Sequence, residues 1–383
     1  MNLVSVGAFD RFNYGDLLFP LVLDAAWNEV SNSPMRHFAL HGASGRAWGT
    51  LPSESARALR EYFEAESGVS GCIVAGGDVL GASWFDLAWH SLPSVLDMPA
   101  AALSRLVPRS KLSSSVRRIA GGKWRLPFVP DAVTARRVPI VYNAVGATSM
   151  SGMSEIDRSY VVDALKSASY VSVRDKTGND LLREMGVHSV LVPDSASVIK
   201  KLMPGFPKKP GSVVFQCSRH WLRSQYEDDV FGSIRVLADS FDHVYLLAIG
   251  LAGGHSDMTS LRKIKRALDV DNVSLISPNN VFEVARPIAG ADCYVGSSLH
   301  GAITALAYGT PVVGLNRVPK LTAYLQTWAA DVSYSDVAPS VIADSVLSSR
   351  NRDPADLAEL GDRLSELSSA ATRSMLDIFI GSA

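Results

Sequence analysis

The sequence predicts an α/β fold in which two Rossmann-like, doubly wound parallel sheets face each other across a cleft. Three observations support this prediction. Short apolar segments typical of buried strands alternate with amphipathic helical segments along nearly the whole chain. Residues 200–211 interrupt the alternation with three prolines, two glycines and four lysines, which is typical of an interdomain linker. The 383 residues are enough for two domains of ordinary size.

The first domain is expected to span residues 1–199. Its predicted strands lie at residues 3–8, 72–75, 139–145, 170–173 and 189–192, and its predicted helices at residues 17–30, 155–167 and 177–185. The helical segments space their apolar residues three and four apart, whereas the strands are short continuous apolar runs. Gly186 is a typical residue just past a helix C-terminus.

The second domain is expected to span residues 212–383. Its predicted strands lie at residues 212–217, 243–249, 273–276, 293–296 and 311–315. Its predicted helices lie at residues 228–239, 256–268, 280–289, 299–308, 337–348 and 353–378. Because strands and helices alternate on both sides of the linker, each half is expected to form its own parallel sheet.

Composition and charge exclude several classes of protein. Thirty-seven Lys and Arg balance thirty-eight Asp and Glu, so a whole-chain nucleic-acid binder is not expected. The longest nearly uncharged apolar run, residues 244–254, is shorter than the roughly 20 residues that span a bilayer, and the first residues lack the basic start of a secretory signal. Cys72, Cys217 and Cys293 lie far apart in apolar runs. We therefore expect a cytoplasmic protein with reduced thiols, no disulfide framework and no metal cluster.

One segment, residues 101–137, departs from the alternation. It contains nine basic residues and one acid, and it also carries Trp124 and Phe128. A basic loop with aromatic side chains suits an anionic lipid headgroup or a diphosphate. The alternative is a solvated surface insertion.

Polar residues and glycines follow the first predicted strands, at the sheet edge where parallel α/β folds bind ligands. Asn13 and Asp16 follow the first strand, and Asp16 occupies the position of a helix N-cap. A turn and a cap explain most of this pattern, but both side chains are also candidates to face the cleft. Gly76 and Gly77 follow the strand at residues 72–75 and allow a ligand to approach backbone N–H groups.

Two charged residues follow later strands of the first half. Arg174 ends the strand at residues 170–173, and Asp194 follows the strand at residues 189–192. An arginine at a strand end suits a bidentate grip on phosphate or carboxylate. The alternative is a salt bridge from Arg174 to Asp175 or Asp194.

The residues after the strand at 293–296 form the sharpest candidate site. Ser297 and Ser298 turn the chain, and His300 lies in the first turn of the next helix. A helix N-terminus presents N–H groups and a positive dipole end to an anion. His300 is expected to act as a proton donor when an anionic substrate is bound, although a structural role is equally open. Lys320 lies where a second cation reaches the same anion.

Together these pieces resemble the polysaccharide pyruvyl transferase family. The resemblance covers most of the chain and rests on Asn13-x-Gly15-Asp16, Gly76-Gly77, Ser172-x-Arg174-Asp175, Pro193-Asp194-x-Ala196, and Leu299-His300-Gly301 with Ala305, Gly309, Pro311 and Lys320. His255-x-Asp257 also falls where the family often has a histidine and an aspartate.

The resemblance implies a fold like that of the two-Rossmann GT-B glycosyltransferases. It also implies transfer of pyruvate from phosphoenolpyruvate to a sugar of a cell-envelope or extracellular polysaccharide precursor, as a ketal. The acceptor is a sugar or a lipid-linked oligosaccharide, and neither a cofactor nor a metal is required. His300 is then the general acid, Arg174 and Lys320 hold the donor, and Ser297 and Ser298 line the donor side. Asp16, as a second catalytic residue, lines the opposite wall with Asn13, Asp194, Gly76 and Gly77.

Two departures from the family pattern bear on activity. The family usually has arginine where Ser298 stands, and a third glycine where Asp78 stands. Arg317, Arg219 or Arg174 would have to replace the missing guanidinium.

Two other functions stay open. His-Gly followed by Gly-x-Pro also resembles the donor lobe of nucleotide-sugar glycosyltransferases, which carry a glutamate in this helix to bind ribose. Residues 301–309 contain no carboxylate, which argues against a ribose clamp. The second alternative is a non-catalytic member of the family that binds a glycan, a lipid intermediate or a protein.

Overall fold

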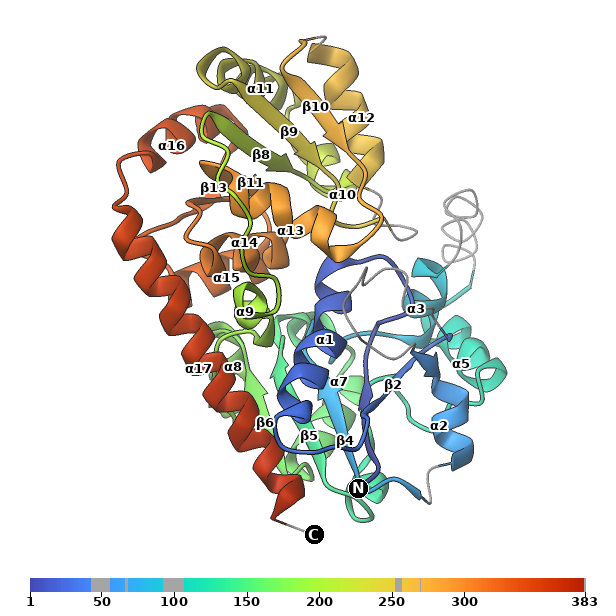
Figure 1. Cartoon of the computed structure of the whole chain (residues 1–383). Coiled ribbons are helices and arrows are strands. Elements are labelled where there is room, and N and C mark those ends of the chain that lie inside the picture. Colours follow the sequence, from blue (N-terminus) through green and yellow to red (C-terminus); the bar gives the residue numbers. More distant parts are fainter. Residues whose placement is uncertain (43–55, 66–67, 92–106, 252–256, 269, 382–383) are drawn as a thin grey trace.

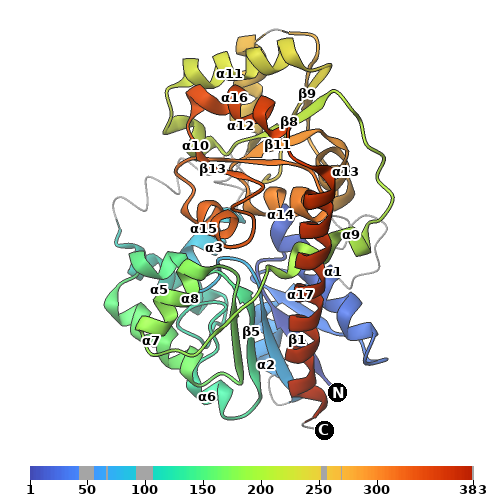
Figure 2. The ribbon, with the colours of Figure 1, turned by 90° about the vertical axis from the view of Figure 1, so that its left-hand side faces the viewer.

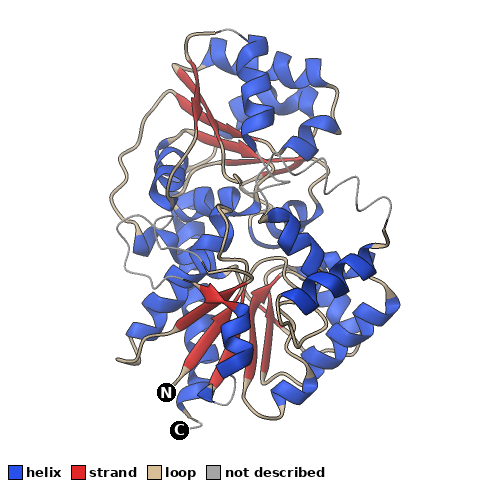
Figure 3. Cartoon of the chain, turned by 90° about the vertical axis from the view of Figure 1, so that its right-hand side faces the viewer, coloured by secondary structure: helices blue, strands red, loops and turns tan. Residues whose placement is uncertain are grey.

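Two parallel β-sheets with helices on both faces form the two lobes of the molecule (Figures 1 and 3). The computed structural model describes residues 1–42, 56–65, 68–91, 107–251, 257–268 and 270–381. Every strand pair in both sheets is parallel, as expected for sheets built from strand–helix–strand units. The predicted fold class is confirmed.

The first lobe contains a seven-stranded sheet of order β3-β2-β1-β4-β5-β6-β7. Its strands are β1 (Leu3–Val6), β2 (Arg36–Ala39), β3 (Arg57–Ala58), β4 (Gly71–Ala75), β5 (Ile140–Val145), β6 (Tyr170–Val173) and β7 (Val190–Leu191). Its helices are α1 (Tyr14–Asn28), α2 (Leu59–Ala65), α3 (Trp84–His90), α5 (Arg109–Ile119), α6 (Ala132–Ala135), α7 (Glu155–Lys166), α8 (Lys176–Glu184) and α9 (Ile199–Leu202).

The second lobe contains a six-stranded sheet of order β10-β9-β8-β11-β12-β13. Its strands are β8 (Ser212–Gln216), β9 (His243–Leu247), β10 (Val273–Ile276), β11 (Cys293–Gly296), β12 (Val312–Leu315) and β13 (Tyr334–Val337). Its helices are α10 (Arg219–Arg223), α11 (Glu227–Ser240), α12 (Asp257–Leu268), α13 (Val281–Gly290), α14 (Leu299–Ala307), α15 (Pro319–Trp328), α16 (Ile342–Ser349) and α17 (Pro354–Ile380).

The last helix, α17, belongs to both lobes. It runs beside the second lobe and continues along the first, so that its C-terminal end lies near the N-terminus of the chain (Figures 1 and 2). Met375, Leu376 and Phe379 are buried in one cluster with Leu3 and Ile73 of the first sheet. The sequence-based boundary assigned this whole helix to the second domain, whereas its last turns complete the core of the first lobe.

Several elements differ from the sequence-based expectation. Helix α1 begins at Tyr14, three residues earlier than predicted, because Asn13 and not Asp16 is the N-cap. Strand β2 was not predicted because it begins with Arg36 and His37. His37 is nevertheless fully buried, since its Nδ1 is 2.7 Å from the Ser5 hydroxyl and its Nε2 is 2.9 Å from Asp24. Strands β3 and β13 and helices α2, α3, α5, α6, α9, α10 and α15 were not predicted either.

The expectation that Trp124 and Phe128 form part of an exposed lipid-binding loop is wrong. Both side chains are buried in the core of the first lobe, where Trp124 donates through its indole N–H to the Thr134 hydroxyl at 3.1 Å. What does stand on the surface is helix α5, which buries none of its residues. Arg105 of the same segment lies outside the described residues.

The state of the cysteines and the length of the apolar helices were both predicted from the composition. Cys72, Cys217 and Cys293 are free and buried. Within the described part of the chain, none of the helices combines the length and the apolar composition needed to cross a bilayer.

Candidate active site between the two lobes

The candidate site lies where the two sheets point their strand ends at each other. In each sheet the strand order reverses direction next to its first strand, between β1 and β4 and between β8 and β11. Ligands of doubly wound sheets bind at the carboxyl ends of the strands at such a point. Asn13, Asp16, Gly76 and Gly77 follow the first pair of strands, and the turn to His300 follows β11.

His300 is the residue of the second lobe that reaches into the first. It lies in the first turn of α14, and its side chain is 12% exposed. The ring lies against the backbone of Gly15, where a Cβ atom would be 1.8 Å from its Nδ1. The Phe19 ring meets it edge to face at 5.4 Å. Helix α1 therefore fixes the plane and position of the imidazole.

Asp194 is the carboxylate that faces this imidazole. Its Oδ2 lies 3.5 Å from Nε2 of His300 and accepts a hydrogen bond of 3.1 Å from Arg174, while its Oδ1 accepts from the Ala196 N–H at 3.0 Å. Burial alone would raise the pKa of Asp194, but the charges of His300 and Arg174 and the hydrogen bonds outweigh it and lower that pKa to about 2. Asp194 is therefore ionised at any physiological pH.

Arg174 serves this carboxylate instead of facing the cleft. The side chain is only 1% exposed, and its Nη1 is bonded to Asp194. A Cβ atom at Gly146 would lie 2.8 Å from Nη2, and the indole N–H of Trp328 donates to the Arg174 carbonyl at 2.8 Å. The structure thus has the salt bridge that was the alternative to a donor-binding role, and a ligand reaches Arg174 only after a rearrangement.

Asp16 and Asn13 lie together on the first-lobe wall. Asn13 donates through its side-chain amide to Oδ2 of Asp16 at 2.8 Å, and both residues are half-buried. Gly76 and Gly77 have φ values of 32° and 77°, which favour glycine. A Cβ atom at Gly77 would lie 3.4 Å from Oδ1 of Asp16. The glycine pair therefore leaves space beside this carboxylate.

The two serines do not leave an open N–H cradle for an anion. The side-chain carbonyl oxygen of Gln216 accepts from the N–H groups of Ser297 and Ser298, at 3.0 and 2.8 Å. The Ser298 hydroxyl caps α14 by accepting from the Gly301 N–H, and the Ser297 hydroxyl accepts from the Ser218 N–H. Both serines therefore hold the turn together, and their N–H groups are used within the protein.

Lys320 is a cation that lies near carboxylates of the first lobe. It is exposed at the start of α15, but the surrounding protein lowers its pKa through desolvation; Asp78 and Asp16 oppose that change, and Arg174 adds to it. Asp16, Asp78 and Asp194 thus offset much of the positive charge. Two further arginines follow strands of the second sheet, Arg219 after β8 and Arg317 after β12. Arg317 donates to the Ser224 carbonyl.

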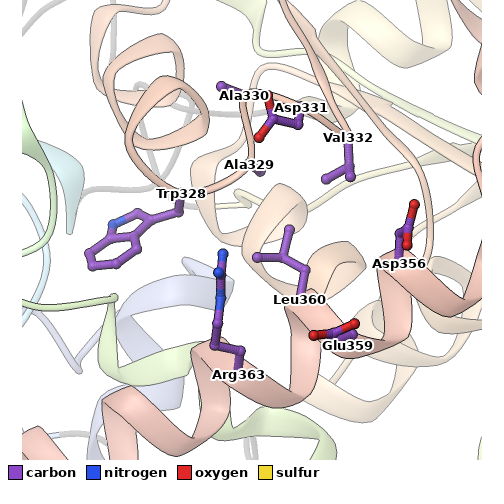
Figure 4. A pocket seen from close by; sticks show the side chains of 9 residues that line it. All are labelled: Trp328, Ala329, Ala330, Asp331, Val332, Asp356, Glu359, Leu360 and Arg363. Carbon is purple, nitrogen blue, oxygen red and sulfur yellow. The ribbon is translucent and has the colours of Figure 1, made fainter.

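Metal-ligating groups and other cavities bear on whether the protein has a further site. Among the described residues, no group of three or more His, Cys, Asp or Glu side chains could hold a metal ion. A separate cavity of about 150 Å³ lies between the end of α15 and the start of α17, and Trp328 and Arg363 are among the residues that line it (Figure 4). None of the predicted site residues lines this cavity.

The comparison with known families agrees with the geometry. The model of the family described as polysaccharide pyruvyl transferase matches residues 13–317, which include the Asn13 turn, the Asp194 turn and the His300 turn. The chain belongs to the polysaccharide pyruvyl transferase family. Among curated proteins, no sequence match was found.

Solved structures with similar folds are enzymes and proteins that bind nucleotide sugars. They include Anabaena HepE in complex with UDP-glucose (10% identity, 100% of both chains, TM-score 0.59) and the Neisseria meningitidis UDP-GlcNAc 2-epimerase bound to UDP-GlcNAc (10%, 100% of both chains, 0.54). MnaA of S. aureus with UDP is similar at 12% identity over 97% of this chain and 94% of that chain, with a TM-score of 0.58. At such identities the likeness shows a shared two-lobed, GT-B-like fold.

Within this family site, some residues were missed by sequence reasoning. Gln216 and Phe19 carry no motif, and their contacts with the His300 turn join segments far apart in the chain. Gly15 entered the sequence analysis only within the motif Asn13-x-Gly15-Asp16. Its place next to Asp16 in this motif marks it as a candidate site position, but nothing in the sequence shows which side chain packs on it.

Substituting Gly15 tests the contact between α1 and the imidazole. We expect Gly15→Ala to lower the free energy of unfolding by about 1–3 kcal/mol, because the added methyl group overlaps the His300 ring. Gly232→Ala is the matched control, since this exposed glycine of α11 has no neighbouring atom within 4 Å and alanine there should stabilise by about 0.5–1 kcal/mol. Urea denaturation measures both. Equal effects of the two substitutions, or no relief from adding His300→Ala to Gly15→Ala, would contradict the contact.

Proposed function

We propose that this protein transfers pyruvate from phosphoenolpyruvate to two hydroxyl groups of a sugar, forming a cyclic ketal. The observation that carries the proposal is the imidazole of His300, held between Gly15 and the ionised Asp194 at the facing strand ends of a chain from the pyruvyl transferase family. A histidine is the side chain best suited to donate a proton near neutral pH.

The reaction needs one proton at carbon and releases one phosphate. A sugar hydroxyl adds to C2 of phosphoenolpyruvate while His300 protonates C3, which turns the methylene group into a methyl group. A second hydroxyl then displaces phosphate from C2. Of the two hydroxyl protons, one replaces the proton that His300 gave and the other leaves with the phosphate. Neither step requires a cofactor.

The proposed reaction gives each residue of the cleft one role: positioning His300, accepting a proton from the acceptor sugar, or binding the donor. Asp194 stays ionised and holds His300 in place, and Arg174 compensates the buried charge of Asp194. Asp16 is suited to accept the acceptor's hydroxyl proton, because Gly77 leaves room beside its Oδ1. Lys320 is suited to bind the donor, with Arg219 and Arg317 in place of the arginine that the family has at position 298.

We propose that the acceptor binds to the first lobe and is a sugar of a polysaccharide precursor. The family description supports a sugar acceptor, and Asn13, Asp16 and the glycine pair offer hydrogen-bonding groups that suit hydroxyls. A precursor of a cell-envelope or extracellular polysaccharide, free or lipid-linked, fits this wall. We place the reaction in the cytoplasm, at the inner face of the plasma membrane.

Phosphate release from phosphoenolpyruvate in the presence of candidate sugar acceptors tests the reaction directly. Loss of a general acid typically costs about 10²–10⁴-fold in rate, so we expect His300→Ala to lower phosphate release by at least about a hundredfold. His243→Ala, at the opposite end of the second sheet, is the matched control and should leave the rate unchanged. If His300→Ala releases phosphate at the wild-type rate, His300 is not the acid.

Ligand-induced stabilisation separates the proposal from the alternatives. Phosphoenolpyruvate at a hundred times its Kd should stabilise the native state by about 2.7 kcal/mol and raise Tm, whereas UDP-glucose should not. The reverse result would favour a nucleotide-sugar transferase. Stabilisation by a glycan alone, without phosphate release, would favour a non-catalytic glycan-binding protein.

We further propose that helix α5 contacts an anionic membrane near a lipid-linked acceptor. The helix buries none of its residues, and Ile119 next to Arg118 is 81% exposed. Lys111, Arg117 and Arg118 have no carboxylate partner among the described residues, whereas Arg125 is paired with Asp157 at 2.6 Å. Three cations without a carboxylate partner among the described residues therefore lie on α5, whereas Arg125 in the aromatic stretch that follows is paired.

Vesicle sedimentation tests this surface. Each Lys or Arg near an anionic leaflet contributes about 1 kcal/mol, so replacing Lys111, Arg117 and Arg118 by Gln should weaken binding about a hundredfold. The same change at Arg235, Arg262 and Arg266, exposed on the second lobe, is the control. Equal binding of both variants to phosphatidylserine vesicles would rule out α5 as the contact.

A further inference from the structure

A buried pair, Gln216 and Asp257, lies behind the cleft and contacts both walls of it. Gln216 ends β8 and is 2% exposed, and Asp257 begins α12 and is 3% exposed. The side-chain N–H of Gln216 donates to Oδ2 of Asp257 at 2.9 Å. Neither side chain touches the open cleft, so neither is a candidate to bind substrate.

Gln216 holds the turn that carries His300. Its Oε1 accepts from the N–H groups of Ser297 and Ser298, and the Tyr294 hydroxyl lies 3.4 Å from it. Because the amide oxygen takes both N–H groups, the turn into α14 has one fixed geometry. His300 follows two residues later, so its position depends on this oxygen.

Asp257 holds the second-lobe residues that pair with the Asp16 turn of the first lobe. Its Oδ2 accepts from the N–H groups of Ile249 and Gly250, both at 2.9 Å. That loop in turn pairs with the first lobe, since the Tyr14 N–H donates to the Ile249 carbonyl at 3.2 Å and the Leu251 N–H to the Phe12 carbonyl at 2.9 Å. Asn13 and Gly250 form an antiparallel bridge at the same place. Gly15 and Asp16 follow directly.

We propose that Gln216 and Asp257 form a positioning pair that sets the His300 turn of the second lobe against the Asp16 turn of the first. The hydrogen bond from the Gln216 amide to the Asp257 carboxylate links the two turns, in addition to the direct contact of the His300 ring with Gly15. The direction of that bond matters: Gln216 offers an oxygen to the α14 turn and an N–H donor to Asp257, which an amide does at any pH and a carboxyl group only while it is protonated. This role is independent of the identity of the substrate.

Because the groups around the pair are neutral, a second carboxyl group introduced at position 216 would interact strongly with Asp257. Tyr294 and Cys217 face it, and burial raises the pKa of both, so both stay neutral below pH 9. Tyr14, beyond Tyr294, also has a raised pKa because it is buried. Burial likewise raises the pKa of Asp257, against the N–H groups of Gly250, Ile249 and Gln216, to about 6. A carboxyl group in place of the Gln216 amide would share a proton with Asp257 at low pH and repel it at high pH.

Hydrogen exchange tests the positioning role without reference to any reaction. Leaving buried partners unsatisfied should speed exchange about tenfold to a hundredfold at both residues 12–16 and 297–301 in Gln216→Ala and in Asp257→Ala. Ser233→Ala is the matched control, because it removes another buried hydrogen bond of the second lobe, to the Pro339 carbonyl. If either variant loosens only its own turn, or if the control loosens both turns equally, the proposal is wrong.

The pH profile of Gln216→Glu tests the direction of the bond. Resting on the proposed function, we expect its kcat for phosphate release to match wild type within about threefold at pH 5.5 and to fall at least about tenfold relative to wild type by pH 8.5. Because wild type contains the same His300, the ratio of the two profiles isolates the pair. Adding Asp257→Asn should restore the rate at pH 8.5, because the new amide donates to the introduced carboxylate.

The kcat profile and the hydrogen-exchange experiment distinguish failure of the positioning pair from failure of the proposed reaction. A flat kcat ratio, or no rescue by Asp257→Asn, overturns the proposal when wild type releases phosphate. If wild type releases no phosphate, the reaction is wrong, and the exchange experiment together with the unfolding free energy of Gln216→Glu at pH 5.5 and 8.5 still decides the positioning pair. That free energy should fall with rising pH in Gln216→Glu and recover in the double variant.

Discussion

The buried carboxylate of Asp194 is the charge on which both halves of the site depend. An unpaired carboxylate in a protein interior costs several kcal/mol, so the first lobe supplies Arg174 beside it, and the second lobe supplies His300. Because the group stays ionised, with a pKa of about 2, the imidazole always faces a negative charge. This carboxylate therefore links the two lobes, because its Arg174 partner comes from the first lobe and the imidazole comes from the second.

Charge balance decides where a donor anion can bind. Arg174 is committed to Asp194, and Gln216 takes the N–H groups of Ser297 and Ser298. Asp16 and Asp78 add negative charge on the first-lobe side, near Lys320. The cations that we propose for a donor anion, Lys320, Arg219 and Arg317, therefore follow strands of the second sheet.

The sequence predicts the strands best where both faces are buried, since such strands are continuous apolar runs, as at β6 and β11. It fails at β2, where burial of His37 depends on Ser5 and Asp24 from other elements. The strand-end rule likewise locates His300, Asp16 and Asp194. It does not reveal that Arg174 turns inward, that Gln216 fills the α14 turn or that Gly15 seats the imidazole, because these depend on contacts between residues far apart in the chain.

A double-mutant cycle between Asp194 and His300, on kcat/KM for phosphate release, tests the central claim most directly. If Asp194 acts through the imidazole, Asp194→Asn should lower the rate in the wild-type background and have little further effect when His300→Gln is already present. Effects of the two substitutions that simply multiply would contradict the account, because they would mean that the carboxylate and the imidazole act independently.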